Sequence, residues 1–325
     1  MRLPSKTTIP CLQVILASQL HGLSLLEWAE KTTLELLLES GQTFPPFQLD
    51  RHLRSLRKVT SIRFQDSLPE RARLRAHKDG FDVEIDSKYI HHLGWRRFLL
   101  AHEIAHTYFY ESKPNGVGDR LFIRHGDPDL EWLCDYLARS LLIPMEALTK
   151  QLSQVEESST TGFNFATLFD LSRKFSVPWQ IMAGRLVEDT ALWRALVLLW
   201  KSEGVTPDLD WRLQWQTAPR ELSSEIFVPI GRRQKSGEMK FPRAKGRLAK
   251  ALCGIAAENN GDSTITSLPL FDLTIGNLYK TLQNDPVASS SLVQCSILGG
   301  QRNETFEWSE PSNRSKSVLM AVNLS

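Results

Sequence analysis

Two runs of alternating polar and apolar residues form the clearest β pattern in the chain. Residues 71–77 alternate strictly, and residues 81–86 alternate again after Asp79-Gly80. Asp-Gly is a favoured two-residue hairpin turn, so we expect the two runs to form an antiparallel hairpin over residues 71–86. The register that follows pairs His77 with Asp82, Arg75 with Glu84 and Arg73 with Asp86 on one face, and Ala76 with Val83 and Leu74 with Ile85 on the other. Opposite charges then meet on one face and apolar side chains on the other, which supports this register.

Apolar residues at helical spacing predict most of the other elements. The predicted helices cover residues 12–40, 47–59, 95–110, 129–143, 164–175, 178–188 and 190–201. Ser24 and Glu27 have the spacing of a capping box within the first of these segments. The second segment has a basic outer face, formed by Arg51, Arg54, Arg57 and Lys58. Several glycines and prolines predict a loop over residues 113–128.

After residue 205 the pattern changes to short β-like runs separated by glycine, serine and asparagine. These runs cover residues 226–230, 292–298 and 317–322. Together with a linker-like segment at residues 158–162, they predict three parts. These parts are a first domain over residues 1–157, a helical, helix-turn-helix-like extension over 163–203, and a C-terminal α+β domain over 204–325. The predicted fold class is α+β, with a mainly helical first domain that contains a small antiparallel sheet.

The composition is that of an ordinary folded protein and excludes a largely disordered chain. Of the 325 residues, 42% are hydrophobic and 23% are charged. Lys and Arg number 39 and Asp and Glu 37, so the net charge of +2 gives no overall case for nucleic-acid or membrane binding. The four cysteines are far apart, and no run reaches the roughly 18 apolar residues of a membrane span. We therefore expect a cytoplasmic protein with reduced thiols and no membrane association.

The motif that carries chemistry is His102-Glu103-Ile104-Ala105-His106, an HExxH sequence within a predicted helix. Its two histidines are four residues apart, so they share one helix face and can hold one metal ion. Glu103 lies on the adjoining face, where a carboxylate can take a proton from a water molecule that the metal activates. In a chain with eight histidines, this pattern would arise by chance in roughly one such sequence in a hundred.

A peptidase of this kind needs a third protein ligand and an open coordination position. The metzincin extension is absent, because Phe109 and Ser112 stand where it requires glycine and histidine. Glu131 is the preferred third ligand, since Asp135 follows it on the same face of an otherwise apolar helix. We expect Asp135 to accept a hydrogen bond from the far nitrogen of a ligand histidine. The weaker rivals of Glu131 are Asp119, Asp127 and Asp129.

Several segments, in this order, resemble the ImmA/IrrE-type metallopeptidases. Residues 97–101 and the HExxH motif are similar to that family's RFxLAHELGH signature, and residues 131–144 resemble its ExxANxFAxxLLMP segment. Residues 168–186 are similar to its LAxxFxVSxxxxxxRL stretch. The resemblance covers roughly residues 45–190, with Cys134-Asp135 in place of the commoner Ala-Asn and Ile104-Ala105 in place of Leu-Gly.

The resemblance implies a zincin-like domain and a zinc-dependent endopeptidase of the gluzincin type. It would carry one zinc ion per chain, with manganese as the alternative metal. His102, His106 and Glu131 would hold the ion. Glu103 would act as general base and pass its proton to the leaving amine. Such enzymes commonly cleave helix-turn-helix repressors and so switch on mobile-element or stress-response genes. The expected partner is therefore a protein substrate of that class.

Two parts of this mechanism have several candidates. The oxyanion needs a donor, and the candidates are His125, Tyr108, Tyr110 and Tyr136. The strand predicted over residues 81–86 is a candidate edge for an extended substrate, with plain sheet architecture as an equal alternative.

Two other functions compete with the peptidase. Residues 168–188 resemble a helix-turn-helix in which Arg173, Lys174 and Arg185 would face DNA phosphates. Packing is favoured for this segment, because its aromatic residues are typical of a core. The other alternative is a catalytically silent metal-binding regulator that acts by protein or DNA binding. Glu103 favours the enzyme, since a structural metal site needs no general base. The sequence indicates no oligomeric state.

Overall fold

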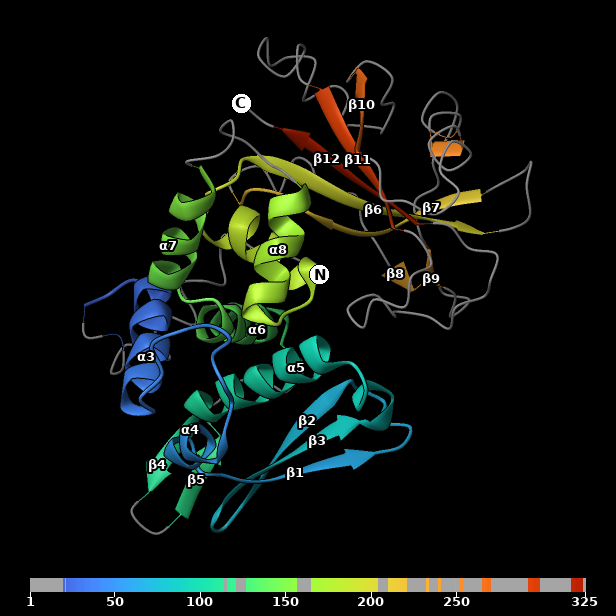
Figure 1. Cartoon of the computed structure of the whole chain (residues 1–325). Helices are drawn as coiled ribbons and strands as arrows, with labels where there is room; N and C mark the ends of the chain where they lie inside the picture. The colour runs from blue at the N-terminus through green and yellow to red at the C-terminus, as the bar shows by residue number, and fades with distance from the viewer. Residues whose placement is uncertain are drawn as a thin grey trace. The chain divides into compact units, whose positions relative to one another are not determined.

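A computed structural model of the chain shows two compact units (Figure 1). The first unit comprises Met1–Ser159 and Leu168–Arg185, and the second comprises Thr160–Thr167 and Leu186–Ser325. The structure describes residues 20, 22–113, 116–120, 127–156, 165–203, 210–220, 232–233, 239–240, 249, 252–253, 265–269, 292–298 and 317–323. Within these residues, no helix combines the length and the apolar character that crossing a membrane requires.

A three-stranded sheet forms one layer of the first unit. Its strands are β1 (Val59–Gln65), β2 (Ala72–His77) and β3 (Gly80–Asp86), in the order β1-β3-β2. The central strand β3 runs antiparallel to β2 and parallel to β1. The predicted hairpin is confirmed, but the sheet is mixed, because β1 pairs with the other side of β3.

The register of the hairpin differs from the predicted one by two residues. His77 lies opposite Gly80 rather than Asp82, so the two-residue turn is Lys78-Asp79 instead of Asp79-Gly80. Gly80 has a φ of 156°, which favours glycine, and a Cβ atom there would lie 2.2 Å from the carbonyl oxygen of Lys58. Close packing against Lys58 therefore explains why this glycine lies in the strand and not in the turn. A shift of two residues leaves each side chain on its predicted face.

The helix predicted over residues 47–59 is shorter, and a strand follows it. Helix α4 (Arg51–Leu56) is capped at its N-terminus by the carboxylate of Asp50. The helix ends before Lys58, which has a left-handed φ of 56° and leads into β1. The N–H of Phe81 donates to the Lys58 carbonyl at 2.8 Å, so contact with β3 outweighs the helical pattern here.

Except for α7, which is not among the predicted ranges, the other helices of the described residues lie close to their predicted positions. They are α3 (Leu25–Glu39), α5 (Leu93–His106), α6 (Pro128–Leu142), α7 (Met145–Glu156), α8 (Phe165–Phe175) and α9 (Trp179–Ala183), and a π-helical turn over Gly184–Asp189 follows α9. Short 3-10 turns cover Ser87–Tyr89 and Thr107–Phe109. The predicted capping box of Ser24 and Glu27 is present at the start of α3. Residues 12–19 lie outside the described residues.

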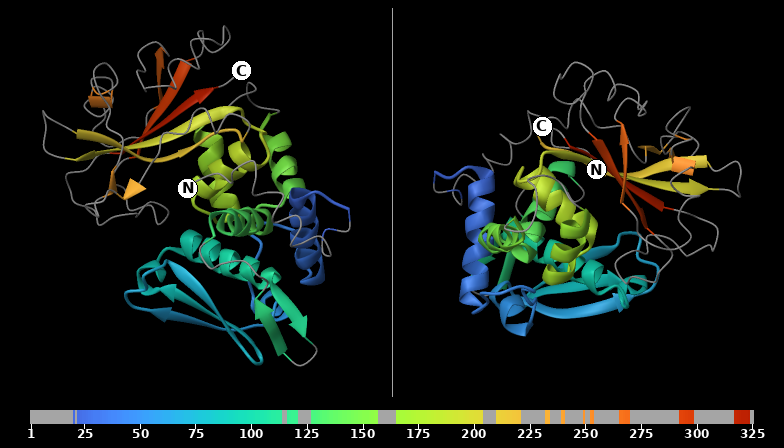
Figure 2. Two further views of the ribbon diagram at one scale, coloured as in Figure 1. Left: turned by 180° about the vertical axis from the view of Figure 1, so that it is seen from behind. Right: turned by 45° about the horizontal axis from the view of Figure 1, so that its top comes forward.

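Helix α5 lies between the sheet and α6, and α3 packs against α6 (Figures 1 and 2). The core between these helices is apolar and includes Leu25, Trp28, Ala29, Ala105, Phe109, Leu130, Leu133 and Leu137. Because α5 is covered on both sides, 11 of its 14 residues are buried. A polar side chain on this helix therefore lies in the interior and needs a partner.

A short hairpin follows α5, where the sequence predicts the end of a helix and a loop. Its strands β4 (Tyr110–Lys113) and β5 (Gly116–Arg120) pair antiparallel, and α5 itself ends at His106. The ring of Tyr110 packs edge-on against that of Phe81, with ring centres 5.0 Å apart. This contact with β3 holds the chain extended and explains the difference.

The second unit contains a five-stranded antiparallel sheet in the order β10-β11-β12-β6-β7. Its strands are β6 (Ala195–Glu203), β7 (Asp210–Thr217), β10 (Ile265–Pro269), β11 (Leu292–Leu298) and β12 (Ser317–Asn323), and β8 (Arg232–Arg233) pairs separately with β9 (Met239–Lys240). The strands predicted over residues 292–298 and 317–322 are confirmed. The run 226–230 lies outside the described residues.

The helix predicted over residues 190–201 is wrong, because most of this segment forms β6. Every residue from Ala195 to Trp200 is buried. A strand covered on both faces is a continuous apolar run, and in the sequence such a run has no period that separates it from a buried helix. The fold class is α+β as predicted, with a mainly helical first unit and a second unit whose described elements are mostly strands.

Candidate metal centre

The two histidines of the HExxH motif face the same point from α5. They are four positions apart along the helix, so both rings project toward α6. The Nε2 atoms of His102 and His106 lie 3.1 Å apart. His106 is buried, and the side chain of His102 is 13% exposed. The site therefore lies at the edge of the interior, with limited access to solvent.

Helix α6 supplies a carboxylate to the same point. Asp127 caps the helix and Pro128 occupies its first turn, so Glu131 lies in the first turn as well. An Oε2 atom of Glu131 lies 3.2 Å from His102 Nε2 and 3.6 Å from His106 Nε2. A tetrahedral zinc ion with bonds of about 2.0–2.1 Å holds its ligand atoms about 3.3–3.4 Å apart. The three ligand atoms therefore have separations that suit one ion.

Each histidine ring is also held at its other nitrogen. Nδ1 of His102 lies 2.8 Å from Oδ1 of Asp135, and Nδ1 of His106 lies 3.3 Å from the Sγ of Cys134. An imidazole that gives its Nδ1 proton to such a partner has a lone pair on Nε2, and both lone pairs then point into the space beside Glu131. Ligand histidines in metal sites are commonly held in this way. The residues present thus fit a divalent metal ion.

The charges of the cluster support the same conclusion. Burial lowers the pKa of His102, but Asp135 and Glu131 raise it by more, so it lies well above the ordinary value. Burial raises the pKa of Glu131, but hydrogen bonds and charge interactions with His102 and His106 lower it well below its usual range. The carboxylates of Glu131 and Asp135 therefore stabilise a positive charge held between them. His102, His106 and Glu131 together could hold a metal ion.

Glu103 also lies in this interior. It is 4% exposed, and its charge contributes to raising the pKa of His102. Its place in α5 directly after His102 puts it on the face that adjoins the ligand histidines. A general base would have to lie beside the cluster, and the buried carboxylate of Glu103 has this position.

Several residues that the sequence marks as candidates for the site have other roles in the structure. The Tyr136 hydroxyl donates to Glu30 at 2.7 Å inside the core, so this residue is not an oxyanion donor. The Tyr108 ring is covered by the Arg57 guanidinium at 3.5 Å. His125 lies outside the described residues. The carboxylate of Asp127 caps α6 and is therefore not a third ligand.

Arg185 is not available for the DNA phosphate contact that the helix-turn-helix interpretation of residues 168–188 expects. Arg185 is fully buried and binds Glu30 with two hydrogen bonds, of 2.7 and 2.8 Å. Its Nε donates to the carbonyl of Ile143, which ties the end of α6 to the segment after α9. The aromatic residues Phe175 and Trp179 are buried as well. Packing is thus the role of these residues.

Strand β3 does not offer an edge to a substrate, because it is paired on both sides. The edge strands of this sheet are β1 and β2. The contact of Cys134 with His106 Nδ1 has no signal in the sequence beyond a departure from the family pattern. Away from the site, the contact of Glu30 with Tyr136 of α6 has no signal either, because the two residues lie far apart in the sequence.

Comparisons with known proteins add little to these observations. No family model matches the chain, and no curated protein matches it. Among solved structures, a Mycobacterium tuberculosis transcriptional regulator is similar over 98% of this chain and 94% of its own, with 14% identity and a TM-score of 0.43. A similarity this distant assigns no activity.

Proposed function

We propose that the chain is a zinc-dependent endopeptidase of the ImmA/IrrE type, acting on a protein substrate of the helix-turn-helix repressor class. The observation that supports this most directly is the meeting of His102, His106 and Glu131 at ligand separations of 3.1–3.6 Å. Zinc is the preferred metal, since two imidazoles and one carboxylate form its common catalytic ligand set, and manganese is the alternative. Bound there, the ion would supply Lewis acidity toward a water molecule and a peptide carbonyl.

The residues around the ion have separate tasks in this proposal. Asp135 and Cys134 orient the two histidine rings through their Nδ1 atoms. The Glu103 carboxylate accepts a proton from the attacking water and later gives it to the amine that leaves. Burial of Glu103 keeps that proton from exchanging freely with solvent.

A protein substrate fits the arrangement of the sheet better than a small one. Strand β2 packs against α5, and among the described residues only one of its sides is paired, with β3. An extended peptide can add to a free strand edge through main-chain hydrogen bonds. In this proposal the strand that would bind the substrate is therefore β2, since β3 is paired on both sides.

Metal content and proteolysis, measured together, test the proposal. The proteins are wild type, Glu131→Ala, Glu103→Gln and the control Glu146→Ala, which removes an exposed glutamate from the first turn of α7. Wild type, Glu103→Gln and Glu146→Ala should each carry about one zinc per chain, and Glu131→Ala should lose most of it. Cleavage of repressors encoded beside the gene, followed by mass spectrometry, should fall at least about a hundredfold in Glu103→Gln.

Two outcomes would contradict this proposal in different ways. If Glu131→Ala binds zinc as well as wild type does, the third ligand is wrong. If Glu103→Gln and wild type bind zinc and the same repressor, and neither cleaves it, the chain is the catalytically silent metal-binding regulator instead.

A further inference from the structure

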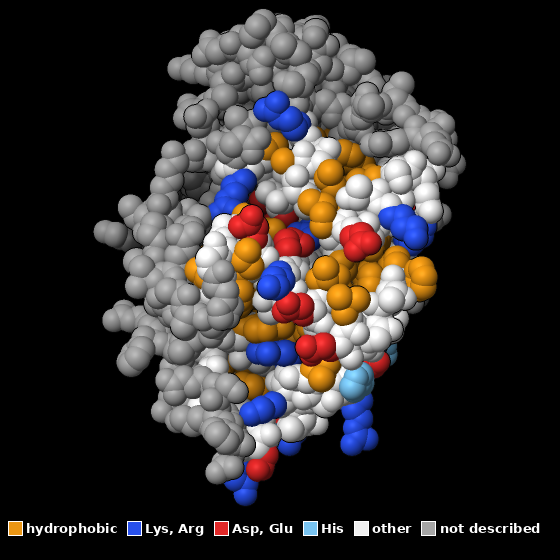
Figure 3. Space-filling view, turned by 90° about the vertical axis from the view of Figure 1, so that its left-hand side faces the viewer, with side chains coloured by type: hydrophobic (Ala, Val, Ile, Leu, Met, Phe, Trp, Pro, Cys, Tyr) orange, Lys and Arg blue, Asp and Glu red, His pale blue; other side chains and the backbone are white. Residues whose placement is uncertain are grey.

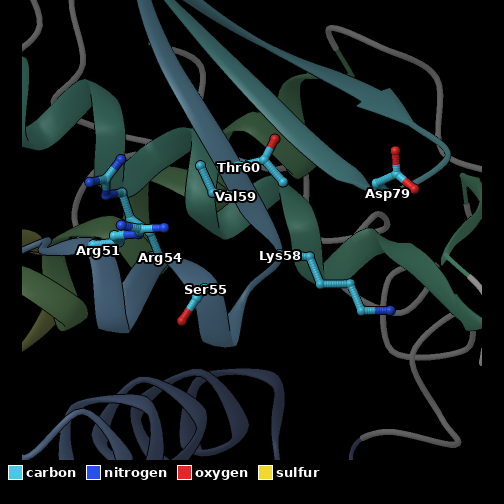
Figure 4. A pocket seen from close by; sticks show the side chains of 7 residues that line it. All are labelled: Arg51, Arg54, Ser55, Lys58, Val59, Thr60 and Asp79. Carbon is cyan, nitrogen blue, oxygen red and sulfur yellow. The ribbon is translucent and has the colours of Figure 1, made fainter.

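A second candidate site lies where α4 meets β1 and the turn between β2 and β3 (Figure 4). A cavity of about 490 Å³ opens there, within the usual range for small-molecule sites. It is lined by Arg51, Arg54, Ser55, Lys58, Val59, Thr60 and Asp79. None of the residues of the candidate metal centre is among them, so this cavity has no part in the proposed function.

The basic face that the sequence places on this segment divides into two parts. Arg57 turns toward the protein, where its Nε donates to the Thr107 hydroxyl at 3.0 Å and its guanidinium covers the Tyr108 ring. Arg51 and Arg54 are three residues apart, so they share one face of α4, and both line the cavity. One arginine therefore serves packing, while two others reach the cavity.

The opposite side of the cavity is built from the backbone contact between Lys58 and β3. The carbonyl of Lys58 accepts the N–H of Phe81, and Gly80 permits the close approach. This contact places the Lys58 side chain and Asp79 beside α4, and Figure 4 shows both at the end of the cavity away from Arg51. The lining is thus held by a helix and two paired strands.

The charge of the lining points to an anion. Arg51 and Arg54 lie together at one end of the cavity, and the one carboxylate of the lining, that of Asp79, lies at the other end. Within the described part of the chain, no carboxylate forms an ion pair with Arg51 or Arg54. The Nε of Arg54 donates to the Asp50 carbonyl at 3.1 Å, which leaves its two NH₂ groups available. Guanidinium groups in this arrangement bind phosphate oxygens through paired, charge-assisted hydrogen bonds.

We propose that this cavity binds a small phosphorylated molecule through Arg51 and Arg54. A nucleic-acid strand would need a longer basic track and aromatic side chains on which bases stack. The lining contains no aromatic residue. The chain has a net charge of only +2, and the described part of the face seen in Figure 3 mixes both signs. A single phosphate group matches the observed cluster better than a phosphate backbone does.

Calorimetric titration of the full chain tests this proposal. The probes are glycerol 3-phosphate, inorganic phosphate, uncharged glycerol and a single-stranded oligonucleotide, all at about 0.15 M salt. The test variant is R51Q/R54Q. Its matched control is K31Q/K150Q, which removes the same charge from exposed positions on α3 and α7. Phosphate bound at the metal centre would give the same heat in all three proteins, so the comparison separates the two sites.

We expect saturable binding of glycerol 3-phosphate by wild type and by K31Q/K150Q, no binding of glycerol, and an affinity at least about tenfold weaker in R51Q/R54Q. A thermal melt of each protein shows whether the variants remain folded. Equal affinity in R51Q/R54Q, or no saturable binding by wild type, would overturn the proposal. Binding of the oligonucleotide without that of glycerol 3-phosphate would replace it with a nucleic-acid surface.

Discussion

The helix pair α5–α6 and the sheet of the second unit differ in how far apart their contacting residues lie in the sequence. His102 and Glu131 are 29 residues apart, and each lies on a helix with its own apolar face. In the sheet, Leu199 of β6 lies opposite Leu319 of β12. The metal centre is thus assembled from nearby segments, whereas β6 pairs with a strand from the far end of the chain.

This difference explains which predictions succeeded. An amphipathic helix shows its buried face through a period of 3.6 residues, whatever it packs against. A strand buried on both faces shows no period, so its type depends on partners that are distant in the sequence. Metal binding by α5 and α6 is therefore expected to depend on residues near the site, and the stability of the second unit on the strands that pair with β6.

Leu319→Ala should give the largest change in stability and leave the metal centre alone. Leu319 is fully buried in β12, the central strand of the five-stranded sheet, and a cavity there costs about 2–5 kcal/mol. The exposed Leu192 gives a matched control, Leu192→Ala, which should cost under about 0.5 kcal/mol. Thermal unfolding and zinc titration check both statements. A loss of zinc affinity in Leu319→Ala would show that the two regions are not independent.

Glu30→Gln should destabilise the first unit by about 3 kcal/mol. It removes the charge that balances the fully buried Arg185, and breaking such a pair from one side is strongly unfavourable. Glu35→Gln is the control on the same helix, because Glu35 is exposed and its pair with Lys31 is at the surface. Chemical denaturation measures both variants. Equal stability of the two would mean that Arg185 finds another partner.

Cys134→Ala should weaken zinc binding by about tenfold, the lower range for loss of a group that orients a ligand histidine. Cys134→Ser retains a hydrogen-bond acceptor for His106 and should recover part of the affinity. Cys253→Ala is the control in the second unit, where the thiol accepts the indole N–H of Trp211. Competition with a zinc chelator gives the three affinities. Unchanged affinity in Cys134→Ala would remove the thiol from the metal centre.

The smallest effect is a dependence of stability on acid. Burial raises the pKa of Glu30, but Arg185, Tyr136 and Ser140 lower it by more, so the folded-state value lies below the ordinary one. The stabilisation is then present above the unfolded-state pKa of about 4.3 and is lost as the pH falls through the lowered value. Unfolding followed from pH 6 to pH 3 should show this loss in wild type. The same slope in Glu30→Gln would assign it to other carboxylates.

Much of the candidate site could be predicted because its chemistry depends on local spacing. The HExxH motif places two imidazoles on one helix face in any packed environment, and the apolar pattern of α6 leaves Glu131 and Asp135 as its conspicuous polar pair. The hairpin of β2 and β3 follows from alternation and a turn signal for the same reason.

Tertiary structure decided what depends on contacts between distant segments. The hairpin register is set by the approach of Gly80 to the Lys58 carbonyl, and α4 gives way to β1 because β3 offers it a partner. Arg185 turns inward because Glu30, 155 residues earlier, meets it in the core. Sequence periodicity records which face of a segment is apolar, whereas the identity of the group that covers or pairs with a residue is determined only when the chain is folded.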